Sequence, residues 1–188
     1  MNWRKLVVPS IGRGELGKML CFTLVGAGLA GFYGVLHDQI TFRISDEYFT
    51  RNKFDQFHYA RPGSGSELEF ASRIGFLASW WVGALTAWVL ARYSLFRRGT
   101  LPCWANMGKA FGVVIGTSAL AAFVGWLWGQ WRTRRGFSEG WIEWMSALGV
   151  QNEEAFMTVG YIHNGSYLGG ILGTVLGILL LRSAQEEP

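Results

Sequence analysis

The amino-acid sequence predicts an all-α integral membrane protein, a four-helix transmembrane bundle with two structured outer loops. Hydrophobic residues make up 50% of the chain and charged residues only 16%, whereas soluble domains are about 25% charged. Four long apolar stretches approach the ~20 residues that a transmembrane helix needs. The 188 residues include 26 Gly and 10 Trp, which suit close helix packing and anchoring at a membrane interface. We expect a single membrane domain over residues 1–188.

Helix-start signals support the placement of the predicted spans. Ser66 and Glu69 have the spacing of a capping box, so the second helix should begin before the membrane. Asn152 can cap the fourth helix, with Glu153 and Glu154 in a first turn where the helix dipole favours negative charge. The predicted spans are residues 16–36, 74–91, 110–128 and 155–181.

The charge distribution predicts the orientation of the bundle. The N-terminal segment, the loop 92–109 and the tail from residue 182 carry nine basic and three acidic residues. The longer outer loops, residues 37–73 and 129–154, carry eight basic and ten acidic residues. The positive-inside rule therefore predicts cytoplasmic N- and C-termini in a bacterial-type inner (plasma) membrane. The basic residues on the predicted inner side are Arg4, Lys5, Arg13, Lys18, Arg92, Arg97, Arg98, Lys109 and Arg182.

Glycine recurs at every fourth position on two predicted helices. Such stripes let a neighbouring backbone come close. Packing inside the bundle is one interpretation, and a seam between chains or a glycine-lined pore is the other. The helix-packing glycines are Gly165, Gly169, Gly173 and Gly177 in the fourth span, and Gly108, Gly112 and Gly116 in and before the third.

Both outer loops are predicted to contain regular structure. The alternating stretch 40–44 resembles a short strand, and Ser45 can cap a short helix after it. We expect this loop to fold over the outer mouth of the bundle. The second loop is expected to form a short amphipathic helix between Ser138 and Gly149, either lying in the membrane interface or packing against the first loop. Its apolar stripe comprises Trp141, Trp144, Met145 and Leu148.

Two of the three histidines, His37 and His163, should lie at a similar depth on the outer side. His37 follows the first span, and His163 precedes Leu181 by about 27 Å of helix, close to the thickness of a ~30 Å hydrocarbon core. We therefore predict a polar cluster there. Its candidate members are His37, Asp38, Gln39, Glu47, His163, Asn164 and Tyr167.

Three interpretations of this cluster remain open, together with the possibility that its members do not meet. It can act as a hydrogen-bonded clamp between the first loop and the fourth helix. It can bind a divalent metal ion at the outer face through His37, Asp38 and His163. It can respond to protons, because histidine titrates near neutral pH.

Common enzyme and nucleic-acid signatures are missing from the sequence. It has no CxxC, HExxH, Walker loop or GxSxG motif, and no catalytic residue can be assigned. Its basic residues lie in short loops rather than on a basic face interleaved with aromatics, so nucleic-acid binding is not expected. The leading expectation is a non-enzymatic subunit or scaffold of a membrane complex, in contact with lipid and with another membrane protein or a second copy. The alternatives are a membrane enzyme or metal-handling protein that uses the cluster, and a small glycine-lined channel or transporter.

Overall fold

The computed structural model describes residues 11–183, and every long element in that range is an α-helix. Four of these helices are long and apolar enough to cross a membrane. They contain 30 to 32 residues, so each is roughly 45 Å long and exceeds a ~30 Å hydrocarbon core. The predicted spans are thus the middle parts of longer helices. These are α2 (Arg13–Ile44), α5 (Glu67–Arg98), α6 (Trp104–Thr133) and α8 (Glu153–Ser183).

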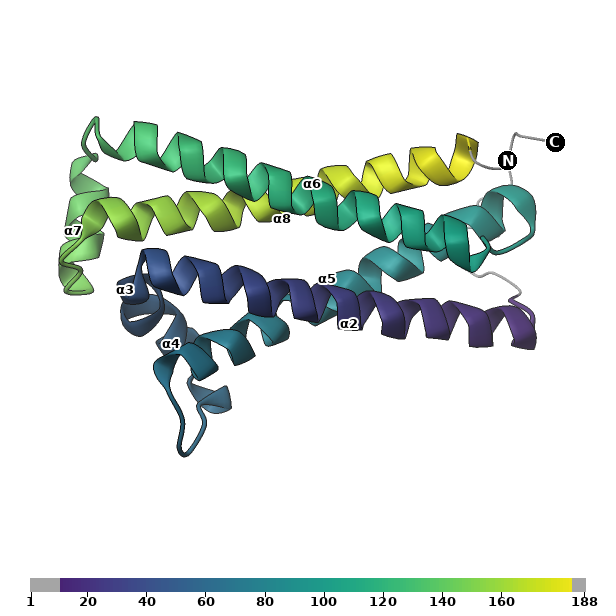
Figure 1. The fold of residues 1–188 in the computed structure, drawn as a ribbon, viewed down its shortest axis with the longest axis horizontal. Coiled ribbons are helices and arrows are strands. Elements are labelled where there is room, and N and C mark those ends of the chain that lie inside the picture. The colour runs from purple at the N-terminus through teal and green to yellow at the C-terminus, as the bar shows by residue number, and fades with distance from the viewer. Residues whose placement is uncertain (1–10, 184–188) are drawn as a thin grey trace.

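The short elements all gather at one end of the bundle, which we call the loop end (Figure 1). At the opposite, terminal end, α2 begins and α8 finishes. Four of the charged residues that were counted to predict the orientation lie outside the described residues: Arg4, Lys5, Glu186 and Glu187. The short elements are α3 (Asp46–Tyr48), the π-helical turn η1 (Phe49–Lys53), α4 (Phe54–Gln56), the 3-10 turn η2 (His58–Ala60) and α7 (Glu139–Ala147).

The predicted strand at 40–44 is wrong, because α2 continues as a helix to Ile44. Thr41 is buried, and its hydroxyl donates to the His37 carbonyl oxygen one turn earlier, at 3.0 Å. Arg43 similarly donates to the carbonyl oxygen of Gln39 at 2.6 Å. Extending an existing helix adds a hydrogen bond for each residue fixed, and residues 11–183 contain no strand that could pair with this segment. The first loop therefore begins at Ser45.

Three predicted caps are confirmed. The Ser66 hydroxyl accepts a hydrogen bond from the Glu69 amide at 3.2 Å, and α5 begins at the next residue. The Asn152 side chain accepts from the Ala155 amide at 3.1 Å at the start of α8. Ser45 caps α3 by accepting from the Tyr48 amide at 3.3 Å. Each cap satisfies an amide that the helix cannot pair internally, which fixes where the loops meet the long helices.

The long helices form two tightly packed pairs, α2 with α5 and α6 with α8. In the α2/α5 pair, small residues face each other across the contact. A Cβ atom on Gly34 would meet the carbonyl oxygen of Gly75, and one on Gly26 would meet that of Gly83 at 2.7 Å. The two backbones are therefore in direct contact, as in small-residue interfaces of membrane helices.

The α6/α8 pair is built in the same way, and it uses the predicted glycine stripe of the last helix. Gly165 and Gly169 lie against the α6 backbone at Ala121 and Thr117. Gly173 lies against the backbone of Val114. Gly177 is less crowded, since its nearest neighbour is the Leu90 side chain of α5, 3.3 Å from a built Cβ. The stripe is thus covered by other parts of the same chain.

The predicted stripe on α6 behaves differently. Gly108, Gly112 and Gly116 have no atom within 4 Å of an added Cβ. The helix instead contacts α8 through Gly125 and Gly129, which lie against Tyr161 and Thr158. Gly108, Gly112 and Gly116 therefore pack against nothing within the described chain, and their predicted packing role applies only to a neighbour outside it.

Contacts between the two helix pairs are sparse by comparison. At the terminal end an apolar cluster that includes Met19, Leu90, Met107 and Leu181 joins all four helices. The lateral surface is largely apolar and open: only 22–33% of the most hydrophobic window of each helix is buried. Exposed side chains such as Ile171, at 67%, would be costly in water and suit contact with lipid.

The predicted amphipathic helix corresponds to α7, whose apolar stripe divides between two environments. Met145 is fully buried and packs with Val150 and Phe156, at the start of α8. Tyr48 of the first loop borders the same cluster. Trp141 is 49% exposed. Packing onto α8 and the first loop thus accounts for part of the stripe, while Trp141 remains available to an interface.

We predict that Gly75→Ala destabilises the protein by about 1–3 kcal/mol, because the new methyl group would collide with backbone atoms of α2 that cannot rotate away. Gly112→Ala is the matched control. Its Cβ meets open space, and the gain in helix propensity favours the folded state by up to about 1 kcal/mol. Unfolding by a denaturing detergent would measure both variants. Equal stabilities would contradict the close α2–α5 contact.

Candidate functional site

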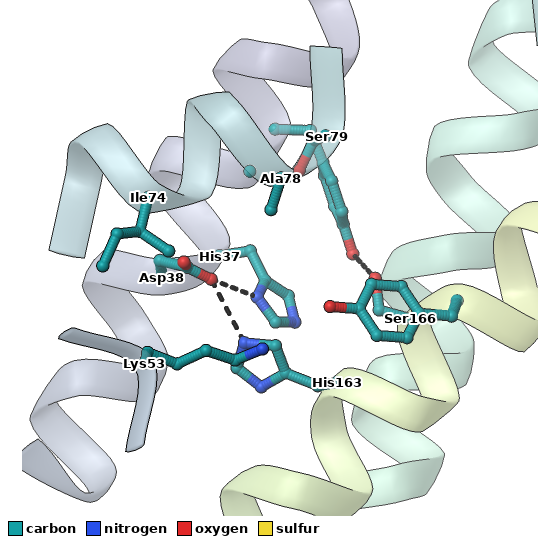
Figure 2. A pocket seen from close by; sticks show the side chains of 11 residues that line it. His37, Asp38, Lys53, Ile74, Ala78, Ser79, His163 and Ser166 are labelled. Carbon is teal, nitrogen blue, oxygen red and sulfur yellow. Dashed lines mark hydrogen bonds and ion pairs between the residues drawn. The ribbon is translucent and has the colours of Figure 1, made fainter. Parts of the chain in front are cut away.

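A buried cluster of two histidines and one aspartate lies between the two helix pairs near the loop end (Figure 2). His37 and Asp38 come from α2, and His163 comes from α8. One carboxylate oxygen of Asp38, Oδ1, lies 3.1 Å from His37 Nδ1 and 3.3 Å from His163 Nε2. The three side chains are only 6–10% exposed. A single carboxylate oxygen thus connects α2 to α8.

His163 is held from several sides. Its Nδ1 lies 3.0 Å from the Val159 carbonyl oxygen, one helical turn earlier on α8. Tyr48 stacks on its ring with centroids 4.9 Å apart, and the His37 ring meets it edge-on at 4.6 Å. The ring therefore has a fixed orientation that directs Nε2 toward Asp38.

A second polar contact joins the pairs about one turn away from the cluster. Tyr33 lies four residues before His37, and its hydroxyl is 2.8 Å from the Ser166 hydroxyl. Further toward the terminal end, the hydroxyls of Thr86 and Thr174 are 3.5 Å apart. Polar contacts between helices therefore continue along the boundary between the pairs, where contacts of any kind are fewer than within each pair.

A small cavity of about 30 Å³ adjoins the cluster. This volume exceeds the roughly 10–15 Å³ that a cavity needs in order to hold one water molecule. Eight of its eleven lining residues have a polar side chain, and His37 Nε2 is buried without a hydrogen-bond partner. The lining residues are Tyr33, Gly34, His37, Asp38, Lys53, Ile74, Ala78, Ser79, His163, Ser166 and Tyr167.

Two side chains from the first loop complete the surroundings. Figure 2 shows Lys53 extending beside the His163 ring. Burial lowers the pKa of Lys53, and the negative charge of Asp38 opposes part of that shift. Burial also raises the pKa of Tyr48, so its hydroxyl stays protonated near neutral pH. The loop therefore covers the cluster with one neutral aromatic ring and one amine whose pKa is lowered by burial.

The structure places the seven predicted cluster residues in different surroundings. His37, Asp38, His163 and Tyr167 line the cavity, and Tyr167 is also half exposed to the outside. The other three, Gln39, Glu47 and Asn164, do not line it. Four of the seven predicted residues therefore lie at the cavity, and the cluster has fewer members than the sequence predicted.

Each of these three residues has another position. Gln39 turns to α5, where its amide donates to the Ser72 hydroxyl at 3.2 Å. Glu47 accepts hydrogen bonds from the amides of Gln151 and Asn152, at 2.9 and 2.8 Å. Asn164 is exposed on α8. Glu47 therefore joins the first loop to the second, next to the start of α8.

Sequence reasoning missed several residues of the site. Tyr33 and Ser166 had a usable signal, because they are four residues before His37 and three after His163 and so share their helix faces. Lys53 and Tyr48 had no such signal in the sequence, because only the path of the first loop through α3 and η1 brings them to the cluster.

Comparison of the chain with known protein families, with curated proteins and with solved structures finds no match. The chemistry of the cluster must therefore be inferred from its own geometry. Two imidazoles and a carboxylate within 4.8 Å of one another can hold protons in a shared hydrogen-bond network, or donate lone pairs to a cation.

We predict that Asp38 and His163 are energetically coupled. Asp38→Ala and His163→Ala should each cost about 1–3 kcal/mol of stability, because each leaves a buried polar partner unpaired. The double variant should cost about 0.5–1.7 kcal/mol less than the sum of the two.

Asn164→Ala is the control, as it changes the neighbouring exposed residue and should stay within about 0.5 kcal/mol of the unaltered protein. Detergent unfolding of the four variants completes the cycle. Strict additivity of the two single changes would show that the contact between α2 and α8 contributes nothing.

Proposed function

We propose that this chain is a non-enzymatic subunit or scaffold of a membrane complex, whose loop end contacts a partner protein. The observation that carries the proposal is the built layer of short helices and turns at the loop end. Hydrogen bonds and aromatic contacts connect the two loops of this layer, and aromatic side chains are exposed on its surface. Lipid, and a second membrane protein or another copy of this chain, are the proposed surroundings.

The layer is held by polar and aromatic contacts between its two loops. The Glu47 carboxylate accepts from two consecutive amides of the second loop. Tyr48 packs on Phe156 with ring centroids 5.3 Å apart. Contacts of this kind fix the shape of the loop surface, and a fixed surface binds a partner with little loss of conformational entropy.

The exposed part of the layer suits protein recognition. Tyr59 is 71% exposed and Trp141 is 49% exposed, and aromatic side chains are enriched in protein interfaces. Exposed acidic and basic residues lie close to them in the sequence, among them Asp55, Arg61 and Glu139. A mixture of aromatic and charged residues is typical of a polar rim around apolar anchors.

The proposed orientation follows from the loop charges. Basic residues are denser at the terminal end than at the loop end, so the positive-inside rule favours a terminal end in the cytoplasm and a loop end outside it. We propose a bacterial-type inner (plasma) membrane as the location. The loop end would then contact the partner protein on the outer face of that membrane.

The alternative function of a glycine-lined channel has less support than the proposed role as a subunit of a membrane complex. The α8 stripe of Gly165, Gly169, Gly173 and Gly177 lies against α6 and α5, so within the described residues it lines no open path. A membrane enzyme or metal-handling protein is favoured by one specific observation, the buried His37–Asp38–His163 cluster.

The subunit proposal predicts that a photoreactive residue in place of Tyr59 crosslinks to a partner protein in intact membranes. The same residue in place of Ile171, which lies in the apolar belt and is 67% exposed, is the control and should mainly meet lipid. Sizing after mild detergent extraction should show the same complex without crosslinking. A monomer in detergent, with no crosslinked protein from position 59, would contradict the proposal.

A further inference from the structure

The hydrogen bonds of His163 determine which of its ring nitrogens carries a proton. The Val159 carbonyl oxygen can only accept, so His163 Nδ1 must donate to it across the 3.0 Å contact. In the neutral ring, Nε2 then carries a lone pair. This lone pair faces Asp38 Oδ1 at 3.3 Å. Two acceptors directed at each other in a buried site require a cation, either a proton or a metal ion.

His37 adds to the excess of lone pairs. If its Nδ1 donates to Asp38 across 3.1 Å, its buried Nε2 keeps a lone pair without a partner. If Nε2 carries the proton instead, the Nδ1 lone pair faces the carboxylate and the Nε2 donor is unsatisfied. Neutral histidines thus leave the cluster without enough donors, although its side chains are only 6–10% exposed.

We propose that His37, Asp38 and His163 bind a divalent transition-metal ion, with Zn²⁺ the best fit. Two imidazoles and one carboxylate form a ligand set that zinc sites use. Metal–ligand bonds of ~2.0–2.1 Å in a tetrahedral site place neighbouring ligand atoms roughly 3.3 Å apart. The observed 3.1 and 3.3 Å separations match that spacing, and the three ligand atoms all lie within 4.8 Å.

The surroundings of His163 are those of a metal ligand. Histidines that bind metals commonly donate their second ring nitrogen to a backbone carbonyl, which fixes the ring and raises its basicity. His163 makes this bond to Val159. The adjoining cavity of about 30 Å³ leaves room for a water molecule as a fourth ligand.

The donor set also selects among metals. Mg²⁺ and Ca²⁺ prefer sites made of oxygen ligands, whereas imidazole nitrogens favour zinc and other first-row transition metals. Lys53 lines the cavity, and its ammonium form would repel a cation. Burial lowers the pKa of that amine, which reduces the free energy needed to remove its proton.

The position of this ion would give it a structural consequence. Two ligands come from α2 and one from α8, so the ion would join the two helix pairs, which make few contacts with each other. This inference goes beyond the subunit proposal and does not depend on it, because it needs no partner protein.

The test uses the full chain in detergent, free of any affinity tag, stripped with a chelator and dialysed against Zn²⁺. Cys21→Ser and Cys103→Ser in every sample remove two exposed thiols that could bind zinc. We expect about one zinc ion per chain by elemental analysis. Asp38→Asn and His163→Gln should weaken binding by at least about 100-fold, since even outer-shell changes cost 10–100-fold.

His58→Ala is the matched control, because it removes the remaining histidine, which is exposed and outside the cluster. It should bind zinc as the parent chain does. A second measurement uses only the parent chain, so it does not depend on whether a cluster variant folds. The parent chain loaded with Co²⁺ should show visible absorption bands of low-coordinate cobalt, and excess Zn²⁺ should abolish them. Failure of the parent chain to bind Zn²⁺, or equal binding by a folded Asp38→Asn variant, would overturn the proposal and leave a protonated His–Asp clamp.

Discussion

The contact between the Asp38 carboxylate and the two histidine rings is the interaction on which the relation between the helix pairs depends. Within each pair the backbones touch through glycines at several successive turns, so each pair is closely packed. Between the pairs, apolar packing is concentrated at the terminal end. At the loop end the Asp38 contacts connect the two pairs, with the Tyr33–Ser166 bond beside them.

Polar contacts have particular weight at such a boundary. Helices in lipid are not driven together by the hydrophobic effect, since lipid tails are as apolar as the side chains they replace. Small residues provide close contact inside each pair, and polar groups provide specific contacts between pairs. The layer of short helices and turns at the loop end also contacts this boundary. Tyr48 stacks on His163, and Glu47 accepts hydrogen bonds from the two amides that precede α8.

The sequence predicts much of this architecture, because long apolar runs and caps act locally. Ser66, Asn152 and Ser45 mark helix starts without knowledge of the fold. The similar depth of His37 and His163 also follows from helix rise alone. The strand at 40–44 was wrong because a five-residue alternation is too short to outweigh the continuation of a long helix.

Other features depend on contacts between distant segments. The glycine spacing at Gly108, Gly112 and Gly116 equals that of the α8 stripe, yet spacing does not specify which face of a helix meets its neighbour. Lys53 and Tyr48 reach the cluster only through the turns of the first loop. Glu47 has its role because that loop meets the second, and no local pattern encodes such a meeting.

The most direct test of the account is the distance between the helix pairs in lipid, measured by electron paramagnetic resonance between two spin labels. In a chain with Cys21 and Cys103 replaced by Ser, labels at Ile40 on α2 and Leu168 on α8 report the gap between the pairs, and labels at Leu120 and Leu168 report the inside of the α6/α8 pair. All three positions are exposed, at 62%, 64% and 66% for Ile40, Leu120 and Leu168. The account predicts that Asp38→Ala broadens or lengthens the Ile40–Leu168 distribution and leaves Leu120–Leu168 unchanged. An Ile40–Leu168 distribution that Asp38→Ala does not alter would contradict it.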